Sequence, residues 1–344
     1  MGRLYSRVLN VRKQTGAALL VVLLLLAIMA AIAATMSERL FSQFTRATHQ
    51  VNYQQAYWYA MGVEALAKVG IRESYEDADT INMSQVWAIE EQVYPLDYGT
   101  AIGRIDDAQA CFNLNALSGN LTTTGNSSRP EVVELFRVML EEVDVEPFQA
   151  EVIADSLWEF TDENNTVQSS TGVEDATYES FSPAYMTANQ MLADESELRA
   201  IYQVSGEVMT KLRPLICALP STDLAINVNT LAEHQAPILS ALFTPELSVD
   251  NAKDIIAGRP FDGWESVEEF LQEASIASLG SGVRDQAQPY LAVDSAYFEL
   301  DAKIEVGDSL VRIRSLLHSE DRENLTVLRR RFGGIGERIS DRSN

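Results

Sequence analysis

The chain has 344 residues, with 26 Lys and Arg against 50 Asp and Glu and a net charge of −24. An acidic surface of this size argues against nucleic acid as a partner, because phosphate binding needs cationic patches. The length is enough for one large or two modest domains.

The amino-terminal segment joins a short basic leader to a long apolar run. The leader cations are Arg3, Arg7, Arg12 and Lys13. They precede Gly16, and residues 17–34 then carry no polar side chain. As a helix this run would be about 27 Å long, close to the hydrocarbon thickness of a bilayer. Because the next cation is Arg39, we expect one membrane segment over residues 17–36, a cytoplasmic amino terminus and an exported remainder.

The junction at Gly16-Ala17 indicates what the apolar run is for. A secretory signal is normally cut after its apolar stretch. Here the junction resembles the class III leader of type IV pilins and pseudopilins, which prepilin peptidase cuts after the glycine. The resemblance implies that residues 1–16 are removed, that the apolar helix stays on the mature chain and that Ala17 becomes an N-methylated terminus. An ordinary signal anchor that contains a glycine is the alternative.

Helical periodicity continues beyond the membrane segment. An apolar stripe follows at helical spacing: Leu40, Phe44, Ala47, Val51, Trp58, Met61 and Ala65. No glycine interrupts it before Gly62, and Gly70 is a plausible end. The pattern predicts one helix from Ala17 to about Lys68, with a bare first half and a second half packed on a sheet. A signal anchor that runs into a first domain helix is the alternative.

The carboxyl-terminal end has the period of β-strands. Residues 298–306 alternate apolar and charged side chains, Gly307-Asp308 is a turn signal, and residues 310–317 and 324–332 follow as two more strands. Three neighbouring strands predict an antiparallel meander, whose apolar face the long helix would cover. We therefore expect an α+β fold in which a pilin-like helix packs on a sheet built from both chain ends.

The middle of the chain is typical of short helices joined by polar turns. Two similar segments, Cys111–Leu117 and Ile226–Leu231, alternate apolar residues with asparagine before helices begin. We interpret them as the starts of two helix-hairpin-helix, SAM-like modules, with the asparagines bonding where strand changes to helix. Both are acidic and lack a Gly-rich hairpin followed by cations, which favours protein contact over DNA binding. Chance similarity of short helices is the alternative.

Cys111 and Cys217 are the two cysteines of the chain. In an oxidising exported compartment, an isolated pair favours a disulfide over a metal or redox site. The bridge would close a loop of about a hundred residues, and in the chain-entropy model it would stabilise the fold by about 4–5 kcal/mol.

In their order and spacing, several motifs resemble the type II secretion minor pseudopilin K family over essentially the whole chain. They are Gly16-Ala17, Gly103-Arg104-Ile105-Asp106, Phe112-Asn113-Leu114-Asn115, Gly172-Val173-Glu174-Asp175 with Tyr178, Ser196-Glu197-Leu198 with Gly206, and Ile226-Asn227-Val228-Asn229-Thr230. The resemblance implies a pilin-like helix and sheet interrupted by a large all-helical insert. The expected boundaries are leader 1–16, membrane helix 17–36, stem helix and first strands 37–112, helical insert 113–219, second module 220–285, and terminal strands with tail 286–344.

An acidic loop offers the hard oxygen ligands that Ca²⁺ prefers. The expected ligands are Glu159, Asp162, Asn164, Glu174 and Asp175. The loop is not an EF-hand, because Val167 and Val173 stand where its glycine and glutamate belong. The resemblance implies calcium binding in the helical domain, and the family's Asp-Trp-x-Asp-x-Asp pattern appears here, altered, as residues 159–164. We therefore expect a structural Ca²⁺ ion, with a solvated acidic loop as the alternative.

The fifth position of the mature chain would be Val21, where most pilins and pseudopilins carry a glutamate that attracts the amino terminus of a neighbouring subunit. A carboxylate inside an apolar bundle persists only where a partner charge meets it. Proteins of the K type also lack this glutamate, and its absence fits the first subunit, at the tip. We therefore expect a minor pseudopilin of the bacterial inner membrane that initiates and caps the pseudopilus exporting folded proteins.

No catalytic motif is found in the sequence, and His49, His234 and His318 fall in three different predicted elements. We expect a chain that is not an enzyme. The partners that the resemblance implies are the I- and J-type minor pseudopilins, the major pseudopilin, prepilin peptidase, inner-membrane lipid and, as a further candidate, secreted proteins. The alternative functions are a signal-anchored periplasmic binding protein or adhesin, or a minor pilin of a type IV pilus.

Overall fold

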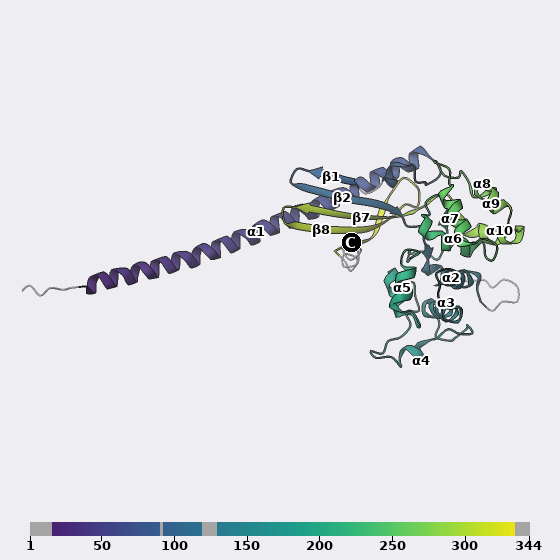
Figure 1. Ribbon diagram of the computed structural model, residues 1–344, viewed down its shortest axis with the longest axis horizontal. Coiled ribbons are helices and arrows are strands. Elements are labelled where there is room, and N and C mark those ends of the chain that lie inside the picture. The colour runs from purple at the N-terminus through teal and green to yellow at the C-terminus, as the bar shows by residue number, and fades with distance from the viewer. Residues whose placement is uncertain (1–15, 90–91, 119–128, 334–344) are drawn as a thin grey trace, which may run out of the picture.

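One long helix dominates the molecule. The computed structural model describes residues 16–89, 92–118 and 129–333, so most of the predicted leader and the end of the predicted tail lie outside the described residues. Helix α1 (Ala17–Asp77) has 61 residues and is about 90 Å long. Its first half projects far beyond the globular part (Figure 1).

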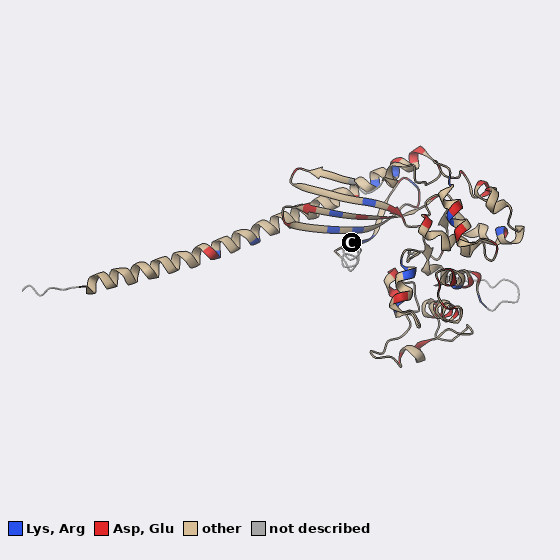
Figure 2. Ribbon diagram, in the orientation of Figure 1, with Lys and Arg blue, Asp and Glu red and all other residues tan. Residues whose placement is uncertain are grey.

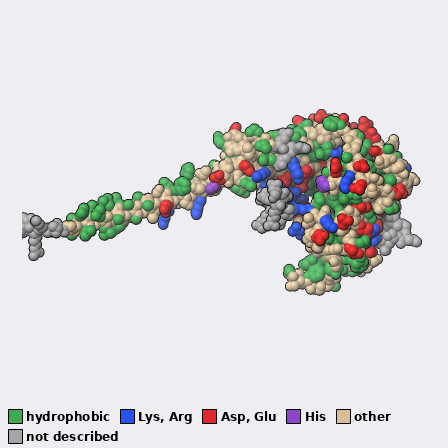
Figure 3. All heavy atoms as spheres, viewed as in Figure 1, with side chains coloured by type: hydrophobic (Ala, Val, Ile, Leu, Met, Phe, Trp, Pro, Cys, Tyr) green, Lys and Arg blue, Asp and Glu red, His purple; other side chains and the backbone are tan. Residues whose placement is uncertain are grey.

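The projecting part of α1 is apolar and bare. Among the described residues, α1 is the helix that is long and apolar enough to cross a membrane, with a mean hydropathy of 3.0 and none of that window buried. Figure 2 shows its outer portion without charged residues, and Figure 3 shows hydrophobic side chains gathered there. This agrees with a membrane anchor, because an exposed apolar surface of this size is unfavourable in water.

Beside α1 lies a five-stranded antiparallel sheet in the order β1-β2-β7-β8-β9. The strands are β1 (Gln92–Leu96), β2 (Gly99–Asp107), β7 (Tyr297–Val306), β8 (Ser309–His318) and β9 (Thr326–Phe332). The three predicted carboxyl-terminal strands are confirmed, with a turn at Gly307, whose φ of 55° suits glycine. Strand β2 pairs with β7 from Gly99↔Val306 to Asp107↔Phe298, so the sheet joins both chain ends as predicted.

Small side chains let α1 approach the sheet. Its buried face consists mainly of Ala56, Ala60, Ala67 and Ile71, in one core with apolar residues of β7 and β8. The apolar stripe predicted for this contact lies elsewhere: Leu40, Phe44, Val51 and Trp58 are 70%, 70%, 61% and 70% exposed. The prediction that this stripe packs on the sheet is therefore wrong for these four residues, whereas Met61 of the same stripe is partly buried against the core. Periodicity located an apolar face of the helix, but alanines form the one that meets the strands.

The helix also continues past the predicted end. Gly62 and Gly70 lie within it, and it ends at Asp77 because its last turns are buried and capped. The Tyr75 hydroxyl donates to the Ser295 carbonyl (2.6 Å). The Arg322 guanidinium donates to the carbonyl of Ala78 (2.5 Å), the residue that follows the helix, and at 3.5 Å to that of Tyr75 in its last turn, one of the unpaired acceptors of a helix end. It also donates to the Asp79 carbonyl (2.9 Å), just beyond the helix.

Between β2 and β7 the chain forms two helical modules at the end of the sheet opposite the projecting helix (Figure 1). A one-turn helix, η1 (Val86–Ala88), precedes the sheet. The first module comprises β3 (Phe112–Asn113), η2 (Leu114–Ser118), α2 (Glu131–Glu142), α3 (Pro147–Thr161), α4 (Asp175–Tyr178), η3 (Glu195–Ala200), α5 (Gly206–Leu212) and β4 (Ile216–Cys217). The second comprises β5 (Ile226–Asn227), η4 (Glu233–Gln235), α6 (Ala236–Leu242), α7 (Val249–Ala257), α8 (Val267–Leu271), α9 (Ala274–Ala277), α10 (Ser281–Ala287), η5 (Gln288–Tyr290) and β6 (Leu291–Ala292).

Each module is closed by a short parallel strand pair, β3 with β4 and β5 with β6. Their apolar residues form one continuous core, in which α2 contacts α6. The second module extends to Ala292, beyond the predicted boundary at residue 285, because β6 has to return to pair with β5.

The modules leave and re-enter the sheet at a narrow neck around the buried side chain of Asp107. Its carboxylate accepts hydrogen bonds from the Gln109 amide (2.8 Å), Asn227 Nδ2 (3.0 Å), Thr230 Oγ1 (2.6 Å) and Ser295 Oγ (2.6 Å). Asn227 Nδ2 also donates to the Ile81 carbonyl (3.0 Å), on the segment that follows α1. One carboxylate thus connects β2, the second module and the segment that leads into β7.

The single carboxylate on the buried face of α1 gives a direct test of how the helix is held. Glu64, 3% exposed, accepts from Arg330 Nε (2.7 Å), Arg330 Nη2 (2.6 Å) and Ser315 Oγ (2.6 Å). Glu64→Ala leaves the buried Ser315 hydroxyl without its partner while Arg330, 33% exposed, can turn to water, and we expect it to lower the free energy of unfolding by about 1–3 kcal/mol. Urea unfolding of the full chain in detergent measures this. Glu73→Ala, on the exposed side of the same helix, is the control, and equal stability of the two variants would contradict the assignment.

Candidate functional site

The predicted processing junction lies at the exposed start of α1. Gly16 precedes the helix with a φ of 93°, a conformation that favours glycine, and Ala17 is the first helical residue. Both are exposed, as is Val21. The residues on the leader side, up to Thr15, lie outside the described part of the chain.

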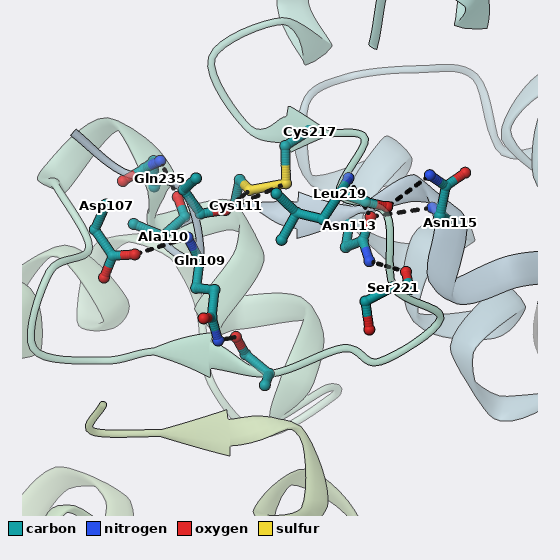
Figure 4. The surroundings of a disulfide bond; sticks show 12 residues. Asp107, Gln109, Ala110, Cys111, Asn113, Asn115, Cys217, Leu219, Ser221 and Gln235 are labelled. Carbon is teal, nitrogen blue, oxygen red and sulfur yellow. Dashed lines mark hydrogen bonds between the residues drawn. A yellow bond between two sulfur atoms is a disulfide. The ribbon is translucent and has the colours of Figure 1, made fainter. Parts of the chain in front are cut away.

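Cys111 and Cys217 form a disulfide in the structure, with their Cα atoms 5.9 Å apart and a sequence separation of 106 (Figure 4). The bond joins the residue before β3 to the last residue of β4, so it links the two ends of the first module. Next to it, Asn113 Nδ2 donates to the Ser221 carbonyl (2.7 Å) and Asn115 Nδ2 to the Leu219 carbonyl (2.7 Å).

The two predicted asparagine motifs have the same bonding pattern. Asn113 Oδ1 accepts from the Asn115 amide (3.2 Å), and Asn227 Oδ1 from the Asn229 amide (3.0 Å). Asn115 then exchanges two hydrogen bonds with the backbone of Leu192 (2.7 and 2.9 Å). Asn229 does the same with Trp264, at the same two distances. Equivalent bonds at equivalent places support the reading of the two modules as copies of one unit.

Three of the predicted calcium ligands come together in the first module. Glu159 lies in the last turn of α3, Asp162 follows that helix, and Glu174 precedes α4. One carboxylate oxygen of each lies within 4.8 Å of the other two. Gly172 lets the loop close over them, since a Cβ there would meet Glu159 Cγ at 2.8 Å and the Asp155 carbonyl at 2.9 Å.

The carboxylate oxygens of this group outnumber the hydrogen-bond donors that the described residues direct toward them. Glu159 Oε1 accepts from the amides of Gln168 (2.8 Å) and Ser169 (2.5 Å). Among the described residues, no hydrogen-bond donor reaches Glu159 Oε2 or either oxygen of Glu174, although both side chains are buried. Burial first, and then the charges of Asp162 and Glu159, raise the pKa of Glu174 to about 7. A bound cation would remove both the repulsion and the missing partners, so these residues fit a divalent ion.

The other two predicted ligands have different roles. Asp175 is not in this group, because its carboxylate accepts from the Thr187 amide (2.9 Å), Thr187 Oγ1 (2.7 Å) and Asn165 Nδ2 (2.6 Å). Asp175 therefore lies outside the group of three, and its role as a calcium ligand stays a prediction. Asn164 Nδ2 donates to Asp162 Oδ2 (2.9 Å), while its Oδ1 accepts from the Thr166 amide (2.9 Å).

Comparisons with known proteins decide the family. Two family models described as type II secretion system (T2SS), protein K match residues 110–221 and 226–294. The chain belongs to the type II secretion system protein K family. Its resemblance to the K-type minor pseudopilins is thereby confirmed, and the role of this family is that of a minor pseudopilin in protein secretion.

Relatives cover nearly the whole chain. Type II secretion system protein K of Aeromonas hydrophila is 37% identical over 94% of this chain and 98% of its own length. The protein K of Pseudomonas aeruginosa is 28% identical over 94% and 95%. Among solved structures, the GspK-GspI-GspJ complex of the enterotoxigenic Escherichia coli type 2 secretion system contains a similar chain. It is 37% identical, has a TM-score of 0.77, and the match covers 84% of this chain and 99% of that one.

The buried Glu174 predicts how stability depends on pH when no divalent ion is present. A glutamate with an ordinary pKa titrates near 4.5, whereas the folded protein holds a proton on Glu174 up to about 7. Between these two values the folded state therefore binds one more proton than the unfolded state. The stability that Glu174 contributes is full below pH 4.5 and is lost as the pH rises through about 7. In chelator we expect wild type to lose up to about 3 kcal/mol relative to Glu174→Gln over this range. Denaturant unfolding at each pH measures the difference, and parallel profiles of the two proteins would contradict it.

Proposed function

We propose that this protein K stands at the tip of the pseudopilus, where it initiates and caps filament assembly from the inner membrane. The observation that carries the proposal is the surface of α1. The helix presents bare apolar side chains through the membrane segment and then along the side of the stem that faces away from its own sheet.

The outward stripe has the spacing of a helix–helix contact. Leu40, Phe44, Val51 and Trp58 follow one another at intervals of four, seven and seven residues. Heptad spacing of this kind places side chains along one seam of a neighbouring helix. The stripe is uncovered in this chain, with Trp58 70% exposed. The partner it suits is the apolar stem helix of another pseudopilin.

The relative of known structure supports the identity of those neighbours. In its complex, GspK of enterotoxigenic Escherichia coli is assembled with GspI and GspJ. We infer that I- and J-type minor pseudopilins pack against α1 here, with the major pseudopilin below them. Prepilin peptidase would first cut after Gly16, in the inner membrane, with the amino terminus cytoplasmic and the globular part exported.

Val21 supports a place at the end of the filament. A glutamate at the fifth mature position would require the amino group of a neighbouring subunit to neutralise it inside the apolar bundle. A chain with valine there needs no such neighbour, so it can be the first subunit.

We also propose that the acidic loop binds one structural Ca²⁺ through Glu159, Asp162 and Glu174. Buried carboxylate oxygens without donors support this, and the ion would supply the positive charge that the described residues around them lack. The same loop begins and ends at helices α3 and α4, so an ion would fix the far side of the first module.

Mass spectrometry of the mature amino terminus tests whether the helix is kept. We expect a chain that begins with N-methylated Ala17. An intact Met1 would favour a signal-anchored periplasmic protein instead. A start beyond Thr35 would remove the apolar helix and contradict the assembly model.

Val21→Glu tests the tip assignment. Because the new carboxylate has no partner at the end of a filament, we expect a loss of pseudopilus assembly of about tenfold or more, as expected for an uncompensated buried charge. Immunogold labelling and counting of pili measure both amount and position. Val22→Leu, a conservative change at the next residue, is the matched control. Wild-type assembly with protein K still at the tip in Val21→Glu would contradict the assignment.

A further inference from the structure

A second contact, apart from the neck, joins the first module to the sheet. Asp194 forms ion pairs with Arg331 and, at 3.9 Å, with Arg329, both on the edge strand β9. Arg329 also donates to the Ala193 carbonyl. We call this contact, made by Ala193, Asp194, Arg329 and Arg331, the latch. Asp194 is only 8% exposed, whereas the side chains of Arg329 and Arg331 are 27% and 41% exposed, so the latch has a buried acid and cations that reach the surface.

The module side of the latch is fixed by its own bonds. Asp194 Oδ1 accepts from the Ser196 amide (3.0 Å) at the start of η3. Two residues earlier, Leu192 exchanges hydrogen bonds with the buried Asn115 (2.7 and 2.9 Å). These bonds hold the end of the segment before Asp194 to the core of the first module, so Asp194 stands at the end of that segment and faces β9.

That segment begins at the acidic cluster. Glu174 is followed by Asp175, whose carboxylate holds Thr187 through its amide (2.9 Å) and hydroxyl (2.7 Å). The backbone amide of Asn189 donates to the carbonyl of Phe160 (3.0 Å), which is the neighbour of Glu159, and Asn189 Nδ2 donates to Asn165 Oδ1 (3.1 Å). Residues 174–194 thus form a strap that is bonded to the cluster at one end and to β9 at the other.

We propose that cation binding at the acidic cluster and closure of the latch are coupled, so that the ion sets how the first module is held against the sheet. The proposal rests on the calcium site proposed above. Without the ion, neither oxygen of the buried Glu174 has a donor, and the acids Asp162 and Glu159 lie beside it, so the strap that starts at Glu174 is loosened. With the ion the strap is fixed, and Asp194 stays opposite Arg329 and Arg331.

Coupling of this kind is reciprocal: if the ion favours the closed latch, the closed latch must favour the ion by the same factor. Weakening the latch should therefore weaken calcium binding, although the latch residues do not touch the cluster. A purely local calcium site would not show this effect.

Calorimetry of the full chain in detergent measures the reciprocal effect. We expect the double variant Arg329→Ala/Arg331→Ala to raise the Kd for Ca²⁺ by about fivefold or more. Lys303→Ala, an exposed cation on β7 that pairs with Glu305, is the matched control and should leave Kd unchanged. Arg331→Lys keeps the positive charge at this position and should bind Ca²⁺ more tightly than the double alanine variant does. This comparison separates loss of the latch from a general loss of folding.

Hydrogen exchange of the same proteins measures the effect of the ion on the strap and the latch. On chelation we expect amides of residues 187–197 and of β9 to exchange about tenfold faster in wild type, and Ca²⁺ to restore them. In the double variant, exchange should be fast with or without Ca²⁺. No heat of calcium binding in wild type would overturn the calcium site itself. Calcium binding with the same Kd in the double variant and in Lys303→Ala would overturn only the coupling.

Discussion

The arrangement of the whole molecule depends on one buried carboxylate. The chain leaves the sheet at Asp107 and returns at Phe298, directly across the β2–β7 pair. The polypeptide of the two modules therefore enters and leaves the sheet through a neck the width of two neighbouring strands. Asp107 accepts four hydrogen bonds there, from Gln109, Asn227, Thr230 and Ser295. Burial raises the pKa of Asp107, and these donors are what make its charge tolerable.

This neck separates two tasks within one protein K. The stem supplies the long apolar helix, the sheet and an outward apolar stripe, the surfaces that we propose for assembly with other stems. The modules supply a globular mass with a disulfide across the first unit and the acidic cluster of Glu159, Asp162 and Glu174. Because the neck and the latch attach the modules to the sheet at two separate places, the modules can have a defined orientation on the stem. A filament tip that must meet partners in one geometry benefits from such fixation.

The sequence predicts the sheet and the bare helix well, because each follows from a local period. Strict alternation in residues 298–306 needs no tertiary information to be read as a half-buried strand. The disulfide and the asparagine motifs also follow from residue type and compartment. The packing face of α1 could not be predicted in this way, because Ala56, Ala60 and Ala67 carry little hydrophobic signal while Phe44 and Trp58 carry a strong one. Only the position of the strands decides between the two faces.

Two further differences have long-range causes. The helix passes Gly70 because Arg322, some 250 residues later in the chain, caps its end. Asp175 has the residue type and sequence position expected of a calcium ligand. In the fold, however, its carboxylate accepts hydrogen bonds from Thr187 and Asn165. Burial and partners of a single carboxylate depend on the tertiary fold, so a list of nearby acids in the sequence does not show which of them lie together.

The central claim is that the Asp107 carboxylate holds the neck, which fixes the orientation of the modules together with the latch. Small-angle X-ray scattering of Asp107→Ala in the full chain, beside wild type at matched detergent, tests it most directly. We expect a broader distribution of distances between stem and modules, with near-ultraviolet circular dichroism showing that each module stays folded. A scattering curve identical to that of wild type would show that the neck does not depend on this carboxylate and would contradict the account.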